Sequence, residues 1–317
     1  MKFCLVTDSL ASLSFEAMLD EAASLGFECL ELCAGNWSQA PHLDLDALLE
    51  SPSARTRFAD AIRSRGLSIE ALNCSGNQLA PNEEGQAHRA VVEGTFELAG
   101  LLGVRKVVMM SGLPGGGPGE RLPNWITTSW PPKNVEILDW QWSEIAMPYW
   151  RDAVRKAADA GVERIALENH GCQLVYNPST LLRLRAEVGP MVGMNLDPSH
   201  LFWMGGEPIA AARFLGAAGA LYHVHAKDVR LERGLVDVDG VLDTRTVDGY
   251  ASRAWNYVAL GYGHDARWWK ELIAVLRMVG YGGAVSLEME DASMDPSTGV
   301  RKSLALLREA WPAPASA

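Results

Sequence analysis

Short apolar runs rich in β-branched and aromatic residues alternate along this chain with longer amphipathic segments. This alternation predicts parallel strands joined by crossover helices. Eight runs have the length and composition of buried strands: residues 2–8, 29–34, 68–75, 106–112, 164–170, 192–197, 221–228 and 284–290. The clearest helical patterns between them cover residues 15–26, 88–103, 147–161, 178–189, 266–280 and 300–311. The chain is therefore predicted to repeat one strand–helix unit.

Glycines mark the point where many of these helical patterns stop. A glycine can adopt the left-handed conformation that ends a helix and leads into the next strand. The positions are Gly26, Gly66, Gly103, Gly161, Gly189 and Gly280. Eight strand–helix units in 317 residues favour an α/β fold, a (β/α)8 TIM barrel, as a single domain over residues 1–317.

A doubly wound open sheet is the rival fold, but the first predicted strand is not followed by a G-x-G-x-x-G turn. A glycine-rich stretch at residues 111–120 resembles a phosphate cradle in composition only. It lacks Gly-Lys-Ser/Thr, and Pro114 and Pro118 supply no backbone N–H to a phosphate. We therefore interpret this stretch as a loop.

Two connections are longer than a barrel needs. Residues 113–148 follow the fourth strand and hold four of the eleven tryptophans, and residues 230–265 follow the seventh strand. Long loops in a compact domain usually cover or bind a ligand, and the loops that follow barrel strands lie on the catalytic face. Two roles stay open for these Trp-rich loops: lids over the substrate, or contacts with a partner subunit or a second copy in a homo-oligomer.

Composition narrows the class of partner. With 48% hydrophobic and 21% charged residues the chain has a globular composition, and its net charge of −11 argues against nucleic acid or an anionic membrane as partner. Five scattered cysteines without paired CxxC spacing, no export signal and no membrane-length apolar run predict reduced thiols and a cytoplasmic location. A small molecule is the expected ligand. His42 and His88 are predicted to lie on the surface.

Candidate metal ligands stand at the ends of the last four strands. Glu168, Asp197 and Glu288 each interrupt an apolar run where its strand should stop, and the seventh strand carries His223 and His225. Any one of them alone is better read as a solvated side chain, and Asp197 as a helix N-cap. Together they indicate one polar site, because the carboxyl ends of barrel strands surround one rim.

Side-chain alternation helps to choose among neighbours. His223 and His225 share a face of their strand, so we expect His225, nearer the strand end, to reach the metal and His223 to lie deeper. Glu288 and Glu290 also share a face, and Glu288 is preferred because a loop follows Glu290.

The ordered motifs "LENH", "LDPSH", "HVHAKD" and "SLEMED" resemble the xylose-isomerase-like barrel superfamily of sugar isomerases, epimerases and inosose dehydratases. The resemblance covers essentially the whole chain. It implies one divalent cation held at Glu168, Asp197, His225 and Glu288, and a substrate contact for His200. Three carboxylates and one imidazole suit Mn²⁺ first, with Mg²⁺, Co²⁺ or Zn²⁺ as other choices.

A cation in such a site would stabilise the enediolate that forms when a carbon beside a carbonyl loses its proton. Glu168 and Glu288 are the first candidates for proton transfer, with His170 and His200 second. For substrate binding we expect His170, His200, Lys227 and His264.

These residues predict a metal-dependent isomerase or epimerase acting on a keto-sugar or a related polyol. The alternative is a lyase acting by elimination or dehydration on a 3-oxo-glycoside or an inosose. The barrel resembles subunits of bacterial enzymes that cleave 3-oxo-C-glycosides, and a metal site that favours an enediolate would serve β-elimination equally well. A non-catalytic sugar-binding barrel and an endonuclease IV-like enzyme fit less well. A non-catalytic barrel would lack some of the four metal ligands, whereas all four are present here. An endonuclease IV-like metal site would need more histidines at strand ends than this chain has.

Overall fold

Eight parallel strands close into a barrel in the computed structural model, which describes residues 1–312. In chain order they are β1 (Lys2–Val6), β2 (Cys29–Cys33), β3 (Ser68–Asn73), β4 (Lys106–Met109), β5 (Arg164–Glu168), β6 (Val192–Leu196), β7 (Leu221–Ala226) and β10 (Ala284–Leu287). Each strand pairs with its neighbours in chain order, and β10 closes the ring against β1. The predicted TIM barrel is confirmed, and the open doubly wound sheet is excluded.

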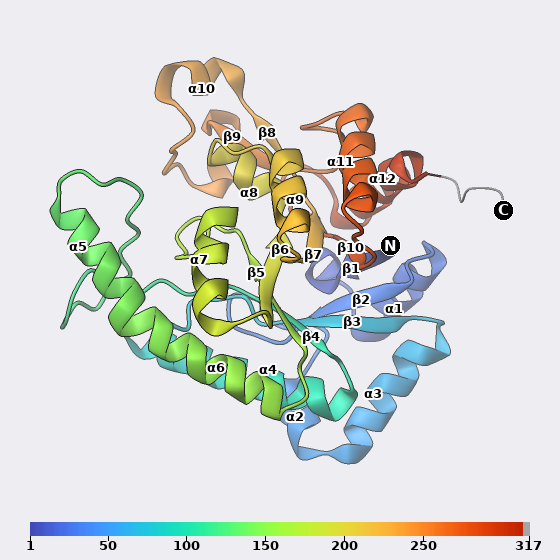
Figure 1. The fold of residues 1–317 in the computed structure, drawn as a ribbon. Coiled ribbons are helices and arrows are strands. Elements are labelled where there is room, and N and C mark those ends of the chain that lie inside the picture. The colour runs from blue at the N-terminus through green and yellow to red at the C-terminus, as the bar shows by residue number, and fades with distance from the viewer. Residues whose placement is uncertain (313–317) are drawn as a thin grey trace.

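Helices surround these strands (Figure 1). They are α1 (Phe15–Ser24), α2 (Leu45–Glu50), α3 (Pro52–Ser64), α4 (Glu83–Leu102), α5 (Lys133–Trp140), α6 (Met147–Asp159), α7 (Pro178–Val188), α8 (Pro198–Trp203), α9 (Pro208–Ala217), α10 (Arg233–Asp239), α11 (Ala266–Met278) and α12 (Pro296–Ala310). All six predicted helical patterns are present. The predicted glycines at helix ends adopt positive φ, for example 70° at Gly103.

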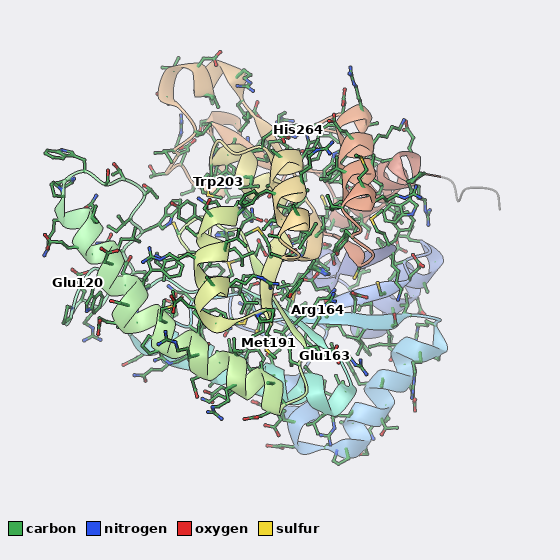
Figure 2. The ribbon with its side chains drawn as sticks, in the orientation of Figure 1. Glu120, Glu163, Arg164, Met191, Trp203 and His264 are labelled. Carbon is green, nitrogen blue, oxygen red and sulfur yellow. The ribbon has the colours of Figure 1, made fainter. Side chains whose placement is uncertain are left out.

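Because all barrel strands are parallel, their carboxyl ends open at one mouth and their amino ends at the other. Figure 2 labels residues at both mouths. Glu163, Arg164 and Met191 lie where β5 and β6 begin, whereas Trp203 and His264 lie beyond the strands' carboxyl ends. The fold therefore gathers residues that are distant in sequence at two separate places.

The two long connections contain secondary structure that their composition concealed. The segment after β4 forms α5, which runs through a π-helical turn at Gln141–Ala146 directly into α6. The segment after β7 forms an antiparallel hairpin, β8 (Asp228–Leu231) with β9 (Trp255–Val258), and α10 between its strands projects at the top of Figure 1.

Two histidines predicted to lie on the surface are buried, so that prediction was wrong. His42 is 4% exposed and His88 is 9% exposed. Each has a backbone partner: His42 Nε2 lies 3.0 Å from the Leu13 carbonyl, and His88 Nδ1 accepts from the Asn77 N–H at 2.8 Å. A satisfied imidazole can be buried at modest cost, and hydropathy alone does not reveal such a partner.

All five cysteines are free thiols, and Cys172 is the exposed one among them. No helix within residues 1–312 combines the length and the apolar character that crossing a bilayer requires.

Candidate metal centre and active site

Four side chains from neighbouring strands meet at the carboxyl mouth of the barrel. Glu168 ends β5, Asp197 follows β6, His225 lies near the end of β7, and Glu288 follows β10. Each offers one ligand atom, and these atoms lie within 4.8 Å of one another. His225 Nδ1 lies 3.0 Å from Glu288 Oε2, 3.6 Å from Glu168 Oε2 and 3.7 Å from Asp197 Oδ2. We call these four residues the metal cluster.

The metal cluster contains buried polar atoms that form no hydrogen bond within the protein. Asp197 Oδ2, His225 Nδ1 and Glu288 Oε2 are buried and form no hydrogen bond. Buried polar atoms are nearly always satisfied, and neighbouring buried carboxylates repel one another, so a cation between them removes both costs. Three carboxylates with one imidazole are ligands that Mn²⁺, Mg²⁺, Co²⁺ and Zn²⁺ accept. The residues present thus fit a divalent cation.

Asp197 combines the two roles that its sequence position suggested. Its Oδ1 accepts from the Ser199 N–H at 2.8 Å and from the Ser199 hydroxyl at 2.7 Å, and so caps α8. Its Oδ2 is left to face the metal cluster. One carboxylate therefore caps the helix and offers a candidate ligand atom, and the cap fixes the direction in which that atom points.

The structure shows which residue of each pair on one strand face, His223 or His225 and Glu288 or Glu290, lies in the metal cluster. His225 belongs to the metal cluster, while His223 lies deeper, with Nε2 2.7 Å from Glu31 Oε2. Glu288 belongs to the metal cluster, while the Glu290 side chain is 45% exposed and pairs with Lys227 at 2.9 Å.

Charge and burial give Glu168 and Glu288 different proton affinities. Burial, reinforced by Glu288 and Asp197 and opposed by His225, raises the pKa of Glu168 to about 7. Burial also disfavours the ionised form of Glu288, but Lys227 and His225 outweigh it and lower the pKa of Glu288 to about 2. Carboxyl groups whose environments separate their pKa values in this way are candidates for an acid and a base.

His200, on α8, lies beside the metal cluster and contacts Glu168. Trp203 Nε1–H, which can only donate, lies 3.3 Å from His200 Nδ1, so Nδ1 accepts and the proton resides on Nε2. That Nε2–H donates to Glu168 Oε1 at 2.9 Å. Burial lowers the pKa of His200 to about 4, in keeping with a neutral ring. His200 thus orients Glu168 here, and its contact with a substrate oxygen stays a prediction.

A cavity of about 200 Å³ opens directly above the metal cluster. Glu168 and Glu288 belong both to its wall and to the cluster, so they are the ligands that can also reach a bound molecule. Of the other predicted substrate contacts, His170 and Lys227 line the cavity. His264 instead pairs with Asp228 at 2.8 Å and stacks on Phe202 with ring centroids 3.7 Å apart.

Sequence reasoning missed several residues of this cavity. Trp37 follows β2, and Tyr257 reaches the cavity from the β8–β9 hairpin. Tyr257 belongs to a segment that we interpreted as a loop from its sequence, so its position on a strand was not predicted. Asp8 was counted within the first strand, although it stands at a strand end just as the predicted ligands do.

The two long segments meet beside the cavity. Trp203 stacks on Trp255 with centroids 4.9 Å apart, and Trp125 packs against the same small cluster. These tryptophans hold the two segments together over α8, which carries His200. Trp130, by contrast, is 75% exposed. Covering the substrate and contacting a second subunit both stay predictions for these segments.

Comparison with known proteins gives consistent matches. A family model described as "Xylose isomerase-like TIM barrel" matches residues 19–310. The chain is 57% identical over 311 residues to the "Uncharacterized protein YfiH" of Bacillus subtilis (strain 168), covering 98% of this chain and 99% of that protein.

Three solved structures illustrate the similarity in fold. They are the "probable 3-DHS dehydratase AsbF" of Bacillus anthracis (TM-score 0.66, 18% identity, 97% of this chain and 99% of that chain), a "D-tagatose 3-epimerase-like protein" (0.63, 20%, 98% and 99%) and "IOLI protein with a binding zinc atom" (0.64, 17%, 98% and 99%). At this identity the likeness shows the fold alone.

Proposed function

Because the chain belongs to the xylose isomerase-like TIM-barrel family, we propose that it is a divalent-metal-dependent isomerase or epimerase acting on a keto-sugar or a related polyol through an enediolate. The observation that carries this proposal is the set of buried atoms without a hydrogen bond on Asp197, His225 and Glu288, next to a cavity whose wall includes Glu168 and Glu288.

The four residues of the metal cluster would hold the cation, with Mn²⁺ as our first choice. When bound there, the cation supplies Lewis-acid stabilisation of the negative charge that develops on the substrate oxygens. The protein's own contribution is to fix the ligands and to place proton-transfer groups beside the reacting carbons.

Glu288 and Glu168 are the proposed proton-transfer pair. Glu288 is the base that takes the proton from the α-carbon, because it lines the cavity and also belongs to the metal cluster. Glu168, in the same cavity wall, is the group that returns a proton to the substrate. The Nε2–H of His200 holds Glu168 Oε1 in place, which leaves Oε2 toward the metal cluster.

The cavity wall suits a hydroxylated ligand. Asp8 Oδ1 and Ser75 Oγ are buried there without a hydrogen-bond partner, and a sugar hydroxyl would satisfy both. Lys227 Nζ lies 3.3 Å from Glu288 Oε2, where its remaining donors can bind a carbonyl or hydroxyl oxygen. Trp37 and Tyr257 offer aromatic faces for the C–H face of a sugar ring.

The same residues could also run the lyase reaction, with Glu168 protonating a leaving hydroxyl β to the carbonyl. The fold likeness to a probable dehydratase motivates testing this second candidate alongside the first. Isomerisation and elimination share the first proton abstraction and differ in the product.

The test is to incubate Mn²⁺-loaded protein with a panel of keto-sugars and inososes in D₂O and to follow the α-carbon by NMR. We expect deuterium at the α-carbon together with a new epimer or isomer. An unsaturated product would favour the lyase. Absence of exchange and product with every compound, at full metal occupancy, would contradict both candidates.

A further inference from the structure

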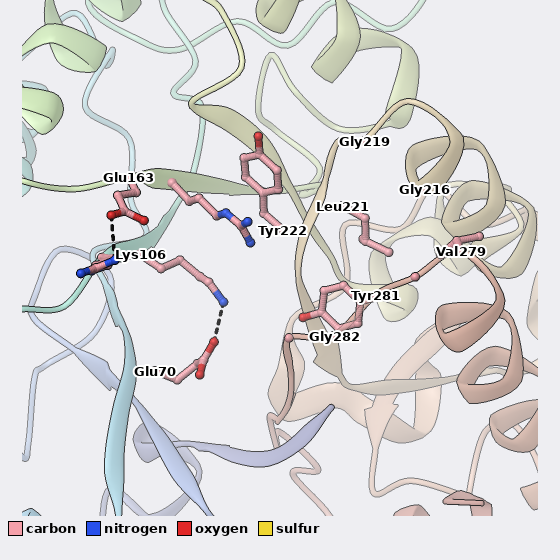
Figure 3. Close-up of a pocket in the computed structure, with 14 residues that line it drawn as sticks. Glu70, Lys106, Glu163, Gly216, Gly219, Leu221, Tyr222, Val279, Tyr281 and Gly282 are labelled. Atoms are coloured by element: carbon pink, nitrogen blue, oxygen red, sulfur yellow. Dashed lines mark hydrogen bonds and ion pairs between the residues drawn. The ribbon is translucent and has the colours of Figure 1, made fainter. Parts of the chain in front are cut away.

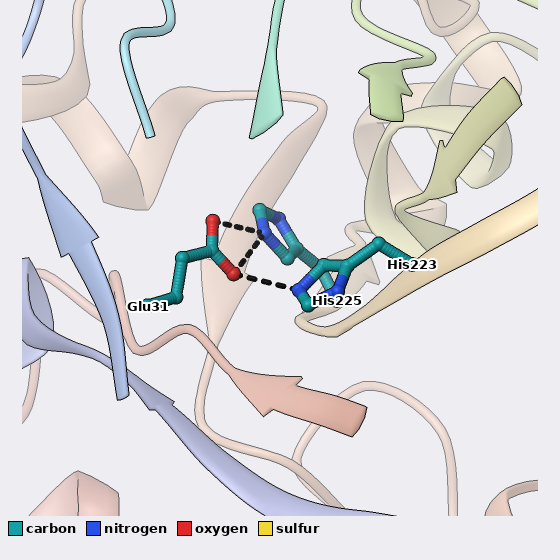
Figure 4. A group of neighbouring side chains, drawn as sticks. All are labelled: Glu31, His223 and His225. Atoms are coloured by element: carbon teal, nitrogen blue, oxygen red, sulfur yellow. Dashed lines mark hydrogen bonds and ion pairs between the residues drawn. The ribbon is translucent and has the colours of Figure 1, made fainter. Parts of the chain in front are cut away.

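A carboxylate in the middle of β2 lies behind the metal cluster. Glu31 is wholly buried and interrupts the apolar run "CLELC". Two histidines of β7 contact it (Figure 4): His223 Nε2 lies 2.7 Å from Glu31 Oε2, and His225 Nε2 lies 3.0 and 3.2 Å from the two carboxylate oxygens. Nothing in the strand-end pattern pointed to this residue.

Further donors fix the Glu31 carboxylate in one orientation. Asn73 Nδ2–H donates to Oε1 at 2.7 Å, and the Ser286 hydroxyl donates to Oε2 at 2.7 Å. Asn73, Ser286, His223 and His225 together surround its two oxygens. Glu31 therefore cannot turn away from His225.

This contact decides which nitrogen of His225 is free. The Glu31 carboxylate accepts from Asn73, Ser286 and His223, and as an acceptor toward His225 as well it places the proton of a neutral His225 on Nε2 and the lone pair on Nδ1. Nδ1 is the atom that faces the metal cluster without a hydrogen-bond partner. Asn195 Nδ2 also lies 3.1 Å from Nε2, but an amide can present its oxygen instead after a half-turn, whereas the carboxylate has no such choice.

The chain of contacts continues through the barrel to its other mouth. Lys106 Nζ, which only donates, lies 3.3 Å from His223 Nδ1, so His223 carries its proton on Nε2 and donates to Glu31. Lys106 Nζ also pairs with Glu70 at 2.7 Å in the wall of the cavity shown in Figure 3. The contacts that hold Glu31 in place therefore extend from the metal cluster to the amino mouth of the barrel.

We propose that Glu31 is the positioning residue of the metal site: it sets the tautomer and ring orientation of His225 and thereby raises the affinity of the metal cluster for a divalent cation. Carboxylates that accept the second N–H of a ligating histidine have this effect in general. The inference rests on the metal site of the proposed function and adds to it a residue outside the ligand set.

The test uses Co²⁺, whose visible absorption reports the number and arrangement of its ligands. Metal-stripped wild-type protein, Glu31→Gln and the control His223→Gln are titrated with Co²⁺ in the presence of a competing chelator. Glu31→Gln should bind about 10–100-fold more weakly and show an altered absorption band. His223→Gln can still donate to Glu31 and accept from Lys106, so its affinity should stay within about threefold of wild type.

Three results would overturn the proposal. Unchanged affinity and spectrum in Glu31→Gln would show that Glu31 does not position His225. An equal loss in both variants would show that the buried polar layer matters only to the fold. Absence of Co²⁺ binding by the wild type would overturn the metal site itself, and this inference with it.

A second variant tests the proposal where Glu31→Gln does not fold. If Glu31→Gln is insoluble, Ser286→Ala removes one donor to Glu31 Oε2 while keeping the carboxylate. It should bind Co²⁺ about threefold more weakly at an unchanged melting temperature of the metal-free protein. Wild-type affinity in a folded Ser286→Ala would contradict the proposal.

Discussion

Charged side chains line both mouths of this barrel, but the two sets differ in whether their buried polar atoms have hydrogen-bond partners within the protein. At the amino mouth, four charged groups form two ion pairs: Lys106 with Glu70 at 2.7 Å, and Arg105 with Glu163 at 3.0 Å. Among the described residues, none that lines the cavity there has a buried polar atom lacking a hydrogen-bond partner. At the carboxyl mouth, three atoms of the metal cluster are buried without one.

Cavity size alone would favour the amino mouth. The amino-mouth cavity measures about 560 Å³ and the carboxyl-mouth cavity about 200 Å³. Converging buried ligand atoms without hydrogen bonds are typical of a binding site, whereas satisfied ion pairs are typical of structural contacts. On this difference we propose that the chemistry takes place at the smaller cavity and that the larger one is structural.

The largest effect is expected from Glu288→Gln at the carboxyl mouth. A positioned base typically contributes about 10²–10⁴-fold to rate, so turnover and solvent-deuterium exchange at the α-carbon should fall by about that factor. The measurement is exchange by NMR at confirmed metal occupancy, because Glu288 is also a proposed ligand.

Glu290→Gln is the matched control for that change, since Glu290 lines the same cavity but lies outside the metal cluster. It should lose less than about tenfold. If metal-loaded Glu288→Gln exchanges protons at the wild-type rate while His170→Ala or His200→Ala abolishes exchange, a histidine is the base and our roles are wrong.

A smaller effect is expected from the segment after β4, which borders the carboxyl mouth. Shortening residues 126–132 keeps Trp125 in the aromatic cluster and removes the exposed Trp130. A lid role predicts that KM rises roughly three- to tenfold while the melting temperature is retained. Steady-state kinetics and light scattering check this together, and a change in oligomer size alone would favour the interface role.

How much the sequence could predict also differs between parts of the barrel. Ligands at strand ends were predictable, because each strand end is a local feature and the barrel brings such ends together. Glu31 was not, because it stands mid-strand and its two histidine partners are 192 and 194 residues away along the chain. The β8–β9 hairpin was not predicted, because its two strands are short and are joined by a polar, glycine-containing connection.

A modest pH effect is expected at His42, outside both mouths. Burial, opposed by the Leu13 contact and Asp8, lowers the pKa of His42. The unfolded chain therefore binds more protons at this residue below about pH 6.5, and its contribution to stability is lost as pH falls from there toward the folded pKa. His42→Gln should lower the melting temperature at pH 7 but make its decline between pH 7 and 5 shallower. An equal decline in both proteins would contradict this.

The smallest effect is expected at the amino mouth. The Arg105–Glu163 pair is exposed, with side-chain exposures of 74% and 58%, so Arg105→Ala should change the free energy of unfolding by about 0–1 kcal/mol. Metal affinity and turnover should not change. A clear loss of either would give the amino mouth a functional role and would end the contrast drawn between the two mouths.

The most direct measurement is metal content after Mn²⁺ loading and gel filtration of wild-type protein and Asp197→Asn. The account predicts about one Mn²⁺ per wild-type chain and substoichiometric metal in the variant, because the amide removes a negative charge from the set of ligands. Wild-type protein without metal, or Asp197→Asn that retains it fully, would contradict the central claim that Glu168, Asp197, His225 and Glu288 form a divalent-metal site.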